Sequence, residues 1–433
     1  MSKKSLTPPV KGERATKWRG GYFSNVGRSP AYLPEGLEAL KKFFIMKGEK
    51  IFNMKVLSYG RQCINEEDIS EVVKVLRGDW LTMGPTVEKF ERSLADYAGV
   101  KHAVTFSSGT AALHGAMHAA GLCPGKKSLT TALTFVATAN SALYTGAGVM
   151  FADIAENFCL DPEKAEQVIK NNGGKVDAIV PVSFAGYPFE IEPFKELAKK
   201  YNAVLIEDAS HAWGGDRGKN KIGFDADMTT LSFHPVKHIT TAEGGAVLTN
   251  SDEFAKSLKL FRNHGTTRDS KEFQDEPDGL WHSEMQNLGY NYRLSELSCA
   301  LGLSQMKRLD EFVQRRRELA RLYFEYLSGV DGVILPPDAE GHAWHLFVLR
   351  VKDPELHGQL FNFLRDNDIR LQVHYRPVPL QPYYRNNFGY KAGDFPEAER
   401  YYSGAISLPI YPSMEDGDVK RVADCIKNFF KSI

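Results

Sequence analysis

The sequence of 433 residues lacks an excess of charge, a membrane-length apolar run and any CxxC pair. Lys+Arg and Asp+Glu both number 54, so no global field attracts nucleic acid or anionic membranes. The five cysteines are scattered and odd in number, which disfavours a disulfide framework and a zinc site. The N-terminus carries charge but no apolar core of a signal peptide. We therefore expect a cytoplasmic protein without a metal centre and without nucleic-acid or membrane partners.

The length exceeds that of one ordinary domain, and the pattern predicts three parts. Residues 1–53 are basic and interrupted by proline and glycine, with one helical candidate at 36–47, so we expect a partly ordered extension. A translation start at Met54 is the alternative. A large domain is predicted over 54–306. A small C-terminal domain is predicted over 307–433, because a long helical pattern changes from small apolar to charged residues near Lys307.

Short apolar strands alternate with helices in the large domain, which is typical of an α/β fold with a mostly parallel sheet. The N-cap Asn65 and the terminating Gly99 mark the first two helices. The small domain reads as α+β, with helices expected at 357–367 and 418–430 and strands at 345–351 and 370–375. In the large domain, the expected strands span 102–108, 128–134, 147–154, 177–183, 203–209 and 228–233.

One lysine stands in an otherwise uncharged run within residues 228–250, MTTLSFHPVKHITTAEGGAVLTN. The first strand breaks at His234, Lys237 follows, and a tight glycine turn leads into a second strand. A lysine held between two strand ends can be desolvated enough to keep a reactive amine. Taken alone, the segment equally fits a hairpin whose lysine reaches solvent.

Asp208 ends the apolar strand AVLIED one strand before the Lys237 hairpin. Acids at the carboxyl edge of a parallel sheet commonly serve a ligand there. An N-cap or a structural ion pair would explain the acid alone equally well. An acid at one end of a pyridine ring and an amine at its aldehyde are what pyridoxal phosphate requires. The pair therefore indicates a pyridoxal-phosphate site.

Two further segments fit the same cofactor. In TFSSGTAAL, a strand, a Ser-Gly-Thr turn and a helix start offer hydroxyls, free amides and a helix dipole to a phosphate, although such residues also cap ordinary helices. Ser232 could add another hydroxyl. Phe135 follows a strand and could stack on a planar ring, although a core phenylalanine is the commoner meaning.

Taken together, the motifs SYGRQ, WLTMGP, FSSGTAAL, LTFVATAN, IEDASHAWGG, SFHPVKHITTAEGG and GYNYRLSE resemble the DegT/DnrJ family of nucleotide-sugar aminotransferases. The resemblance runs from Val56 to the C-terminus, in the order of the family. It implies the type I (aspartate aminotransferase) fold of pyridoxal-phosphate enzymes. It also implies a homodimer with shared active sites and leaves the first 53 residues unmatched.

Carried over residue by residue, the resemblance implies that Lys237 forms the Schiff base with the cofactor and Asp208 pairs with its ring nitrogen. His211 matches the residue beside the 3-hydroxyl, and Phe135 the stacking ring. Asn291 matches a residue that reaches the cofactor phosphate of the neighbouring subunit. The phosphate cup is matched by Ser108, Gly109, Thr110 and Ser232, and the sugar pocket by Tyr59, Arg61, Leu81, Thr82, His374, Tyr375 and Tyr383.

The implied reaction is transfer of an amino group from glutamate to a nucleotide-linked keto-sugar. The segments HPVKHITTAEGG and VHYRPVPLQPYYR are most similar to those of the family branch that aminates C4 of a UDP-linked 4-keto-6-deoxy hexose for glycan biosynthesis. Amination at C3 of a UDP- or dTDP-sugar, a sugar dehydratase and a non-catalytic cofactor-binding regulator are the alternatives. The retained Lys237 disfavours the dehydratase. A nicotinamide oxidoreductase lacks its GxGxxG fingerprint.

Overall fold

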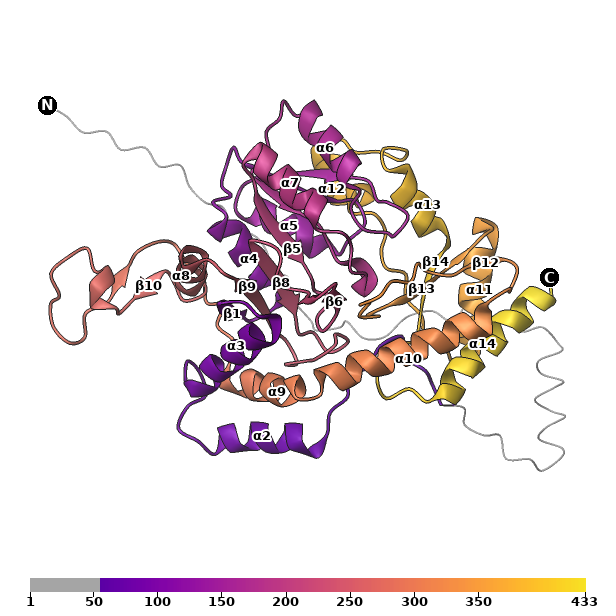
Figure 1. The fold of residues 1–433 in the computed structure, drawn as a ribbon, viewed down its shortest axis with the longest axis horizontal. Helices are drawn as coiled ribbons and strands as arrows, with labels where there is room; N and C mark the ends of the chain where they lie inside the picture. The colour runs from indigo at the N-terminus through magenta and orange to yellow at the C-terminus, as the bar shows by residue number, and fades with distance from the viewer. Residues whose placement is uncertain (1–54) are drawn as a thin grey trace, which may run out of the picture. The chain divides into compact units, whose positions relative to one another are not determined.

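A seven-stranded sheet is the centre of the part of the chain that this computed structural model describes, residues 55–433 (Figure 1). The predicted helix at 36–47 lies outside the described residues. The strands of the sheet are β1 (His102–Phe106), β2 (Lys127–Thr131), β3 (Gly148–Ala152), β4 (Ala178–Val180), β5 (Val204–Asp208), β8 (Met228–Ser232) and β9 (Gly245–Thr249).

The spatial order of these strands is β1-β9-β8-β5-β4-β2-β3. Strands β3, β2, β4, β5 and β8 pair in parallel, whereas β9 runs antiparallel between β1 and β8. Because β5 and β8 are parallel neighbours, with Asp208 beside Thr230, their carboxyl ends meet at one edge of the sheet. The expected mostly parallel α/β sheet is confirmed.

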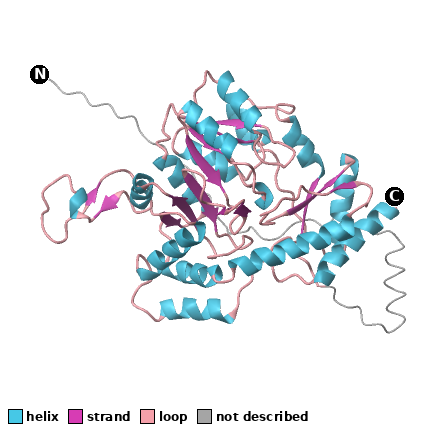
Figure 2. Ribbon diagram, viewed as in Figure 1, coloured by secondary structure: helices cyan, strands magenta, loops and turns pink. Residues whose placement is uncertain are grey.

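Helices cover both faces of this sheet, which is why nearly all residues of its strands are buried, including several threonines (Figure 2). Residues of α4, α5, α6, α7 and α8 join the core on one face, and residues of α3 and α9 join the core on the other. Helix α2 (Glu66–Leu76) packs on α9. The bounds of the other helices are α3 (Pro85–Ala98), α4 (Gly109–Ala119), α5 (Val136–Tyr144), α6 (Pro162–Asn171), α7 (Glu192–Tyr201), α8 (Asp252–Phe261) and α9 (Glu296–Met306).

The first helices begin and end where the sequence predicts. Asn65 caps α2, because its side chain accepts from the amide of Asp68 while the Asp68 side chain accepts from the amide of Asn65. Helix α3 ends at Gly99, which takes the left-handed conformation with a φ of 74°. Both predictions are confirmed.

A second core lies around a three-stranded antiparallel sheet near the C-terminus. Its strands, in spatial order, are β12 (Val333–Ile334), β13 (Phe347–Val351) and β14 (Ala405–Leu408). Its helices are α10 (Leu309–Leu327), α11 (Pro354–Asp366) and α14 (Asp416–Lys431), and two shorter ones, α12 (Pro382–Phe388) and α13 (Pro396–Gly404), connect it to the large sheet. The long helical pattern is two helices, α9 and α10, which separate at Lys307 and Arg308.

The strand expected at 370–375 was wrong. This segment forms one bridge, between Gln372 and Ser407, and then runs irregularly into the cis peptide bond between His374 and Tyr375. The strand that completes the small sheet is β14, which follows α13 directly and pairs with β13. The division of the chain at residues 306 and 307 stays a prediction.

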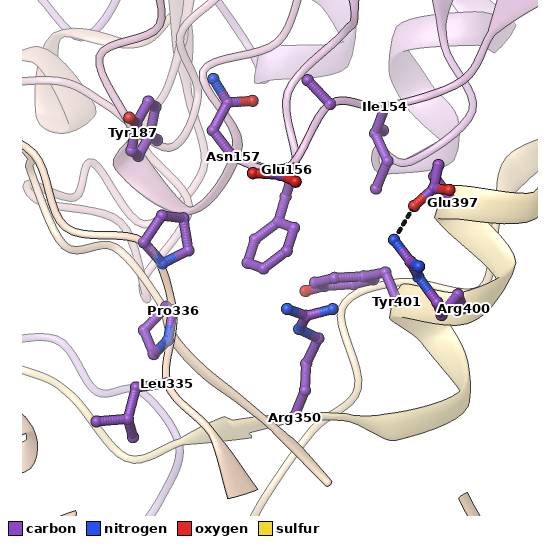
Figure 3. Close-up of a pocket in the computed structure, with 13 residues that line it drawn as sticks. Ile154, Glu156, Asn157, Tyr187, Leu335, Pro336, Arg350, Glu397, Arg400 and Tyr401 are labelled. Carbon is purple, nitrogen blue, oxygen red and sulfur yellow. Dashed lines mark hydrogen bonds and ion pairs between the residues drawn. The ribbon is translucent and has the colours of Figure 1, made fainter. Parts of the chain in front are cut away.

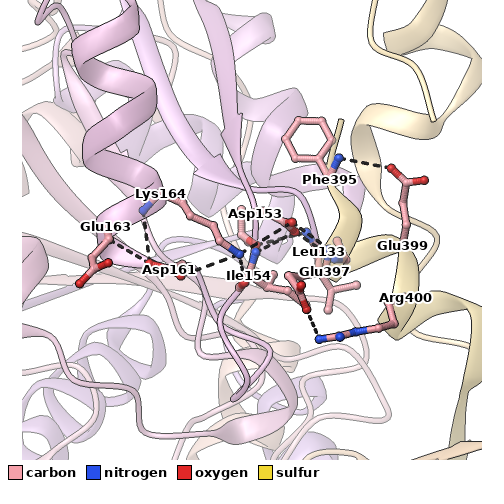
Figure 4. Close-up of polar contacts among 12 residues, drawn as sticks. Leu133, Asp153, Ile154, Asp161, Glu163, Lys164, Phe395, Glu397, Glu399 and Arg400 are labelled. Atoms are coloured by element: carbon pink, nitrogen blue, oxygen red, sulfur yellow. Dashed lines mark hydrogen bonds and ion pairs between the residues drawn. The ribbon is translucent and has the colours of Figure 1, made fainter. Parts of the chain in front are cut away.

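A buried carboxylate joins the large sheet to α13. Asp153, just after β3, accepts the backbone N–H groups of Glu397 and Ala398 in the first turn of α13 (Figure 4). An anion at a helix N-terminus satisfies otherwise unpaired amides and interacts favourably with the helix dipole. This contact fixes where α13 begins and with it the segment that carries Tyr401.

Short elements complete the described residues. They are η1 (Phe184–Gly186), η2 (Ser270–Glu272), η3 (Val378–Leu380), β6 (Asp216–Arg217), β7 (Asn220–Lys221), β10 (Thr266–Thr267) and β11 (Glu284–Met285). Strands β10 and β11 form an arm that extends away from the sheet at the left of Figure 1. None of the helices within residues 55–433 combines the length and the apolar character that a membrane crossing needs.

Candidate active site

A cavity of about 540 Å³ lies at the carboxyl ends of β5 and β8. Eleven of the residues predicted from the sequence line it, together with residues that the sequence did not single out. The structure therefore gathers residues from position 59 to position 375 around one space. The eleven are Tyr59, Ser108, Gly109, Thr110, Phe135, Asp208, His211, Ser232, Lys237, His374 and Tyr375.

Lys237 lies in the loop between β8 and β9, where its amide donates to the carbonyl of His234 at 2.9 Å. Its Nζ is 3.5 Å from Nε2 of His345. Burial lowers the pKa of Lys237 from 10.5 to about 8, Asp208 opposes the shift and Arg316 adds to it. The amine is therefore far easier to deprotonate near neutral pH than an exposed lysine.

Asp208 is 4% exposed at the end of β5. Its Oδ2 accepts from the hydroxyl of Thr138 at 2.7 Å, and its Oδ1 accepts from the amide of Ser210 at 3.1 Å. No lysine or arginine of residues 55–433 forms an ion pair with this carboxylate. A buried carboxylate is costly without a cation. A protonated ring nitrogen in the cavity would supply the missing charge.

The start of α4 forms a seat for an anion. The amides of Gly109 and Thr110 have no acceptor among the described residues, and they point out of the first turn of a helix. Ser108 is the N-cap, and its side chain accepts from the amide of Ala111. A Cβ on Gly109 would lie 2.8 Å from the Cβ of Ser232, so glycine is required for β8 to approach this turn.

His211 is held from two sides. The amide of Ala185 donates to its Nδ1 at 3.3 Å, and its Nε2 lies 3.3 Å from the hydroxyl of Tyr375. Burial lowers the pKa of His211 well below its usual range, so the ring is neutral and Nε2 can carry its proton toward Tyr375. Tyr375 in turn is placed by His374, whose carbonyl accepts from the Tyr401 hydroxyl at 2.8 Å.

The chain matches the DegT/DnrJ/EryC1/StrS aminotransferase family over residues 62–427. It belongs to this family. The large sheet, the lysine loop after β8 and the acid at the end of β5 are thus parts of a pyridoxal-phosphate-dependent transaminase.

Relatives and solved structures agree with this assignment. The chain is 39% identical to a UDP-4-amino-4,6-dideoxy-N-acetyl-beta-L-altrosamine transaminase of Campylobacter jejuni, over 87% of this chain and 98% of the relative. It is similar to Helicobacter pylori PseC, an aminotransferase involved in the biosynthesis of pseudoaminic acid, with a TM-score of 0.81, 32% identity and coverage of 88% and 100%. It is also similar to a Streptococcus pneumoniae putative sugar aminotransferase, Spr1654, in its PLP form, with a TM-score of 0.80, 26% identity and coverage of 87% and 99%.

Five predicted residues lie outside this cavity in the transaminase chain. Arg61, Leu81 and Thr82 are exposed, and Thr82 bridges to Ser295 beside the start of α9. Asn291, which follows the β10–β11 arm, is exposed and bridges to Asn263, which precedes the arm. Tyr383 is 58% exposed and lines a separate apolar groove with residues of α5. Their roles stay predictions.

The cavity also contains residues that the motif analysis missed. His345 lines it from the segment before β13, and its Nδ1 is buried without a partner among residues 55–433. Its pKa lies well below the usual range because of burial and the neighbouring Lys237. Arg316 lies behind it on α10. No signal in the sequence marks either residue, because α10 reads as a charged helix and His345 is the first residue of an ordinary expected strand.

A second cavity, of about 790 Å³, lies between the segment after β3 and α13 (Figure 3). Arg350 enters it from β13 and stacks its guanidinium 4.9 Å from the ring of Phe158. Glu397 and Arg400 form an ion pair at its edge. None of the site residues predicted from the sequence lines this space, whereas eleven of them line the cavity around Lys237.

Proposed function

We propose that this transaminase transfers an amino group from glutamate to the C4 keto group of a UDP-linked 4-keto-6-deoxy hexose, for glycan biosynthesis. The single observation that carries the proposal is the shared cavity of Asp208 and Lys237, with the amide seat of α4 beside them. The name of the Campylobacter jejuni relative supports the nucleotide and the C4 position. The unpaired buried carboxylate and the amide seat fit pyridoxal phosphate at its ring and phosphate ends.

Different residues of the cavity would hold different parts of the cofactor. Asp208 would hold the ring nitrogen of pyridoxal phosphate, and the first turn of α4 with Ser232 would hold the phosphate. Phe135, 53% exposed at the start of α5, would cover one face of the ring. When bound, the cofactor supplies an electron-accepting ring that stabilises charge on the carbon that loses its proton.

Lys237 performs the proton transfers. Its lowered pKa leaves a useful fraction of free amine near neutral pH, so the side chain can take a proton from the amino donor and later give one to the sugar carbon. His211 is neutral and hydrogen-bonded to Tyr375, which suits it to orient the ring hydroxyl without adding charge.

The same proposal includes a homodimer. The arm between α8 and α9 exposes four large apolar side chains, those of Leu280, Trp281, Met285 and Leu288, and exposed apolar groups gathered on one segment favour an interaction surface. Asn291 follows this arm and would reach the cofactor of a second copy. Mixing Lys237→Ala with Asn291→Ala chains tests this, because a mixed dimer regains one intact site and with it part of the activity.

The function is tested with the purified chain, glutamate, pyridoxal phosphate and a panel of UDP- and dTDP-keto sugars. We expect mass spectrometry to find an amino product from the UDP-linked 4-keto-6-deoxy hexose, and NMR to place nitrogen on C4. Lys237→Ala should abolish turnover, whereas the surface variant Lys391→Ala should not change it. Nitrogen on C3, or full turnover by Lys237→Ala, would contradict the proposal.

A further inference from the structure

Arg316 on α10 is a buried cation without a counter-ion. Its side chain is 0% exposed, and no carboxylate of residues 55–433 pairs with it. Its Nε has no partner in the same part of the chain. Burying an unpaired charge costs free energy. A buried arginine without a counter-ion must therefore make other contacts that offset this cost.

The guanidinium of Arg316 instead donates to four peptide carbonyls. Its Nη1 lies 2.8 Å from the carbonyl of Ile410, 3.2 Å from that of Trp344 and 3.3 Å from that of His345. Its Nη2 lies 3.4 Å from the carbonyl of Val236. A planar fork of five N–H donors can join several acceptors, which a lysine ammonium on a flexible stem does less well.

Two of these carbonyls flank the reacting lysine. Val236 immediately precedes Lys237, and His345 is the residue whose Nε2 lies 3.5 Å from the Lys237 Nζ. These two segments are more than a hundred residues apart in the chain, and no strand pairing joins them. Arg316 therefore connects the backbone of both members of the Lys237–His345 contact.

We propose that Arg316 is a positioning residue of the transamination, which keeps the Lys237 amine and His345 in register at the cavity by holding the backbone on both sides of their contact. This inference rests on the role proposed above for Lys237. Arg316 does not touch the cavity itself, so it acts through the two segments that it joins.

Electrostatics adds a second consequence. The charge of Arg316 contributes to the lowered pKa of Lys237, after the larger effect of burial, while Asp208 acts in the opposite direction. The neighbouring imidazoles carry no charge near neutral pH, because burial lowers their pKa values. They are His211, His238, His345 and His374. The other titratable groups that line the cavity are Tyr59, Tyr375, Glu243 and His234, and burial lowers the pKa of His234 as well.

The test compares Arg316→Met and Arg316→Lys with Arg317→Met. Arg317 is the adjacent residue on α10 and donates to the carbonyl of His342 and to Asp216, away from Lys237, so it is a matched control. Each protein is assayed for kcat and KM in the holoenzyme. Competitive labelling of the cofactor-free protein with acetic anhydride over a pH series gives the pKa of Lys237 without any turnover.

For Arg316→Met we expect kcat to fall about tenfold or more with the KM for glutamate little changed, because the substrate does not contact Arg316. The Lys237 labelling midpoint should move to higher pH, by about one unit, because a neighbouring cation is removed. Arg316→Lys should leave the Lys237 labelling midpoint close to that of wild type, because the positive charge is retained. Its kcat should still fall, because lysine lacks the forked guanidinium donors that join the two segments. Arg317→Met should match wild type in both readouts.

The proposal is overturned if Arg316→Met keeps the kcat and the labelling midpoint of Arg317→Met. If Arg316→Met does not fold, Arg316→Lys decides alone, and a wild-type kcat in that variant overturns the inference. Loss of the proposed function is recognised separately: Lys237→Ala would then retain turnover, whatever the Arg316 variants do.

Discussion

The hydroxyl of Thr138 donates a 2.7 Å hydrogen bond to Oδ2 of Asp208, from the first turn of α5 to the end of β5. Thr138 also exchanges a 2.8 Å hydrogen bond with Thr134, so a short polar chain orients the carboxylate that faces the cavity. A buried acid whose orientation is fixed in this way is prepared for a cationic partner before any ligand arrives.

Thr138→Val removes this donor and keeps the shape of the side chain. We expect the dissociation constant for pyridoxal phosphate to rise about tenfold, because hydrogen bonds to charged groups contribute about 1.5–3 kcal/mol. An absorbance titration of the cofactor-free protein measures this affinity. Thr145→Val, which removes a hydroxyl bonded to the Ala142 carbonyl at the far end of α5, should bind like wild type. Equal affinities for both variants would show that Asp208 needs no orienting donor.

The lowered pKa of Lys237 predicts a pH profile for cofactor attachment. The amine must be unprotonated to react, so the attachment rate should rise about tenfold per pH unit below 8 and level off above it. A simple alkylamine with an ordinary pKa, measured in parallel, should continue to rise to about pH 10. Stopped-flow absorbance of the cofactor-free protein mixed with pyridoxal phosphate gives both curves. A protein profile that follows the alkylamine would show an unperturbed lysine.

Gly109→Ala tests the anion seat at the start of α4. The new Cβ would lie 2.8 Å from the Cβ of Ser232, which cannot move without shifting β8. We expect about tenfold weaker cofactor binding, in line with the 1–3 kcal/mol typical of overpacking. The control is Gly358→Ala in α11, where the added Cβ meets nothing within 4 Å, and its binding should be unchanged while its stability increases slightly.

Glu207, buried beside Asp208 on β5, depends on Arg217 for its charge balance. The Nη2 of Arg217 donates to its Oε1 at 2.7 Å. Arg217→Met should lower the free energy of unfolding by about 3–5 kcal/mol, because it leaves a buried carboxylate without its cation. Urea unfolding followed by circular dichroism measures the loss. The exposed pair of Lys420 and Asp424 is the control, and Lys420→Met should leave the unfolding midpoint where it is.

The sequence predicts the part of the site that local patterns encode. Asp208 and Lys237 come together because apolar strands in a parallel sheet place their carboxyl ends at one edge, and alternation of strands and helices reveals such a sheet. The turn before α4 is also visible, because only Ser107 and Ser108 lie between the end of β1 and the glycine that begins the helix. These features depend on neighbours in the chain.

The remaining features depend on contacts between distant segments. Arg316 looks like any surface arginine of a charged helix, and only the packing of α10 shows that it is buried. The segment around His374 alternates like a strand, yet β14 takes its place in the small sheet. Tertiary packing overrides the local pattern in each case.

The cap that Asp153 forms on α13 makes the order of synthesis matter. Strand β3 is an edge strand of the large sheet, and the amides that satisfy Asp153 are translated 244 residues later. In a nascent or truncated chain that ends before α13, the Asp153 carboxylate keeps only the Ile154 amide and the nearby Lys164 ammonium, next to an open sheet edge of the kind that favours aggregation. The last two donors to this carboxylate are thus added late in synthesis, when α13 docks beside β3.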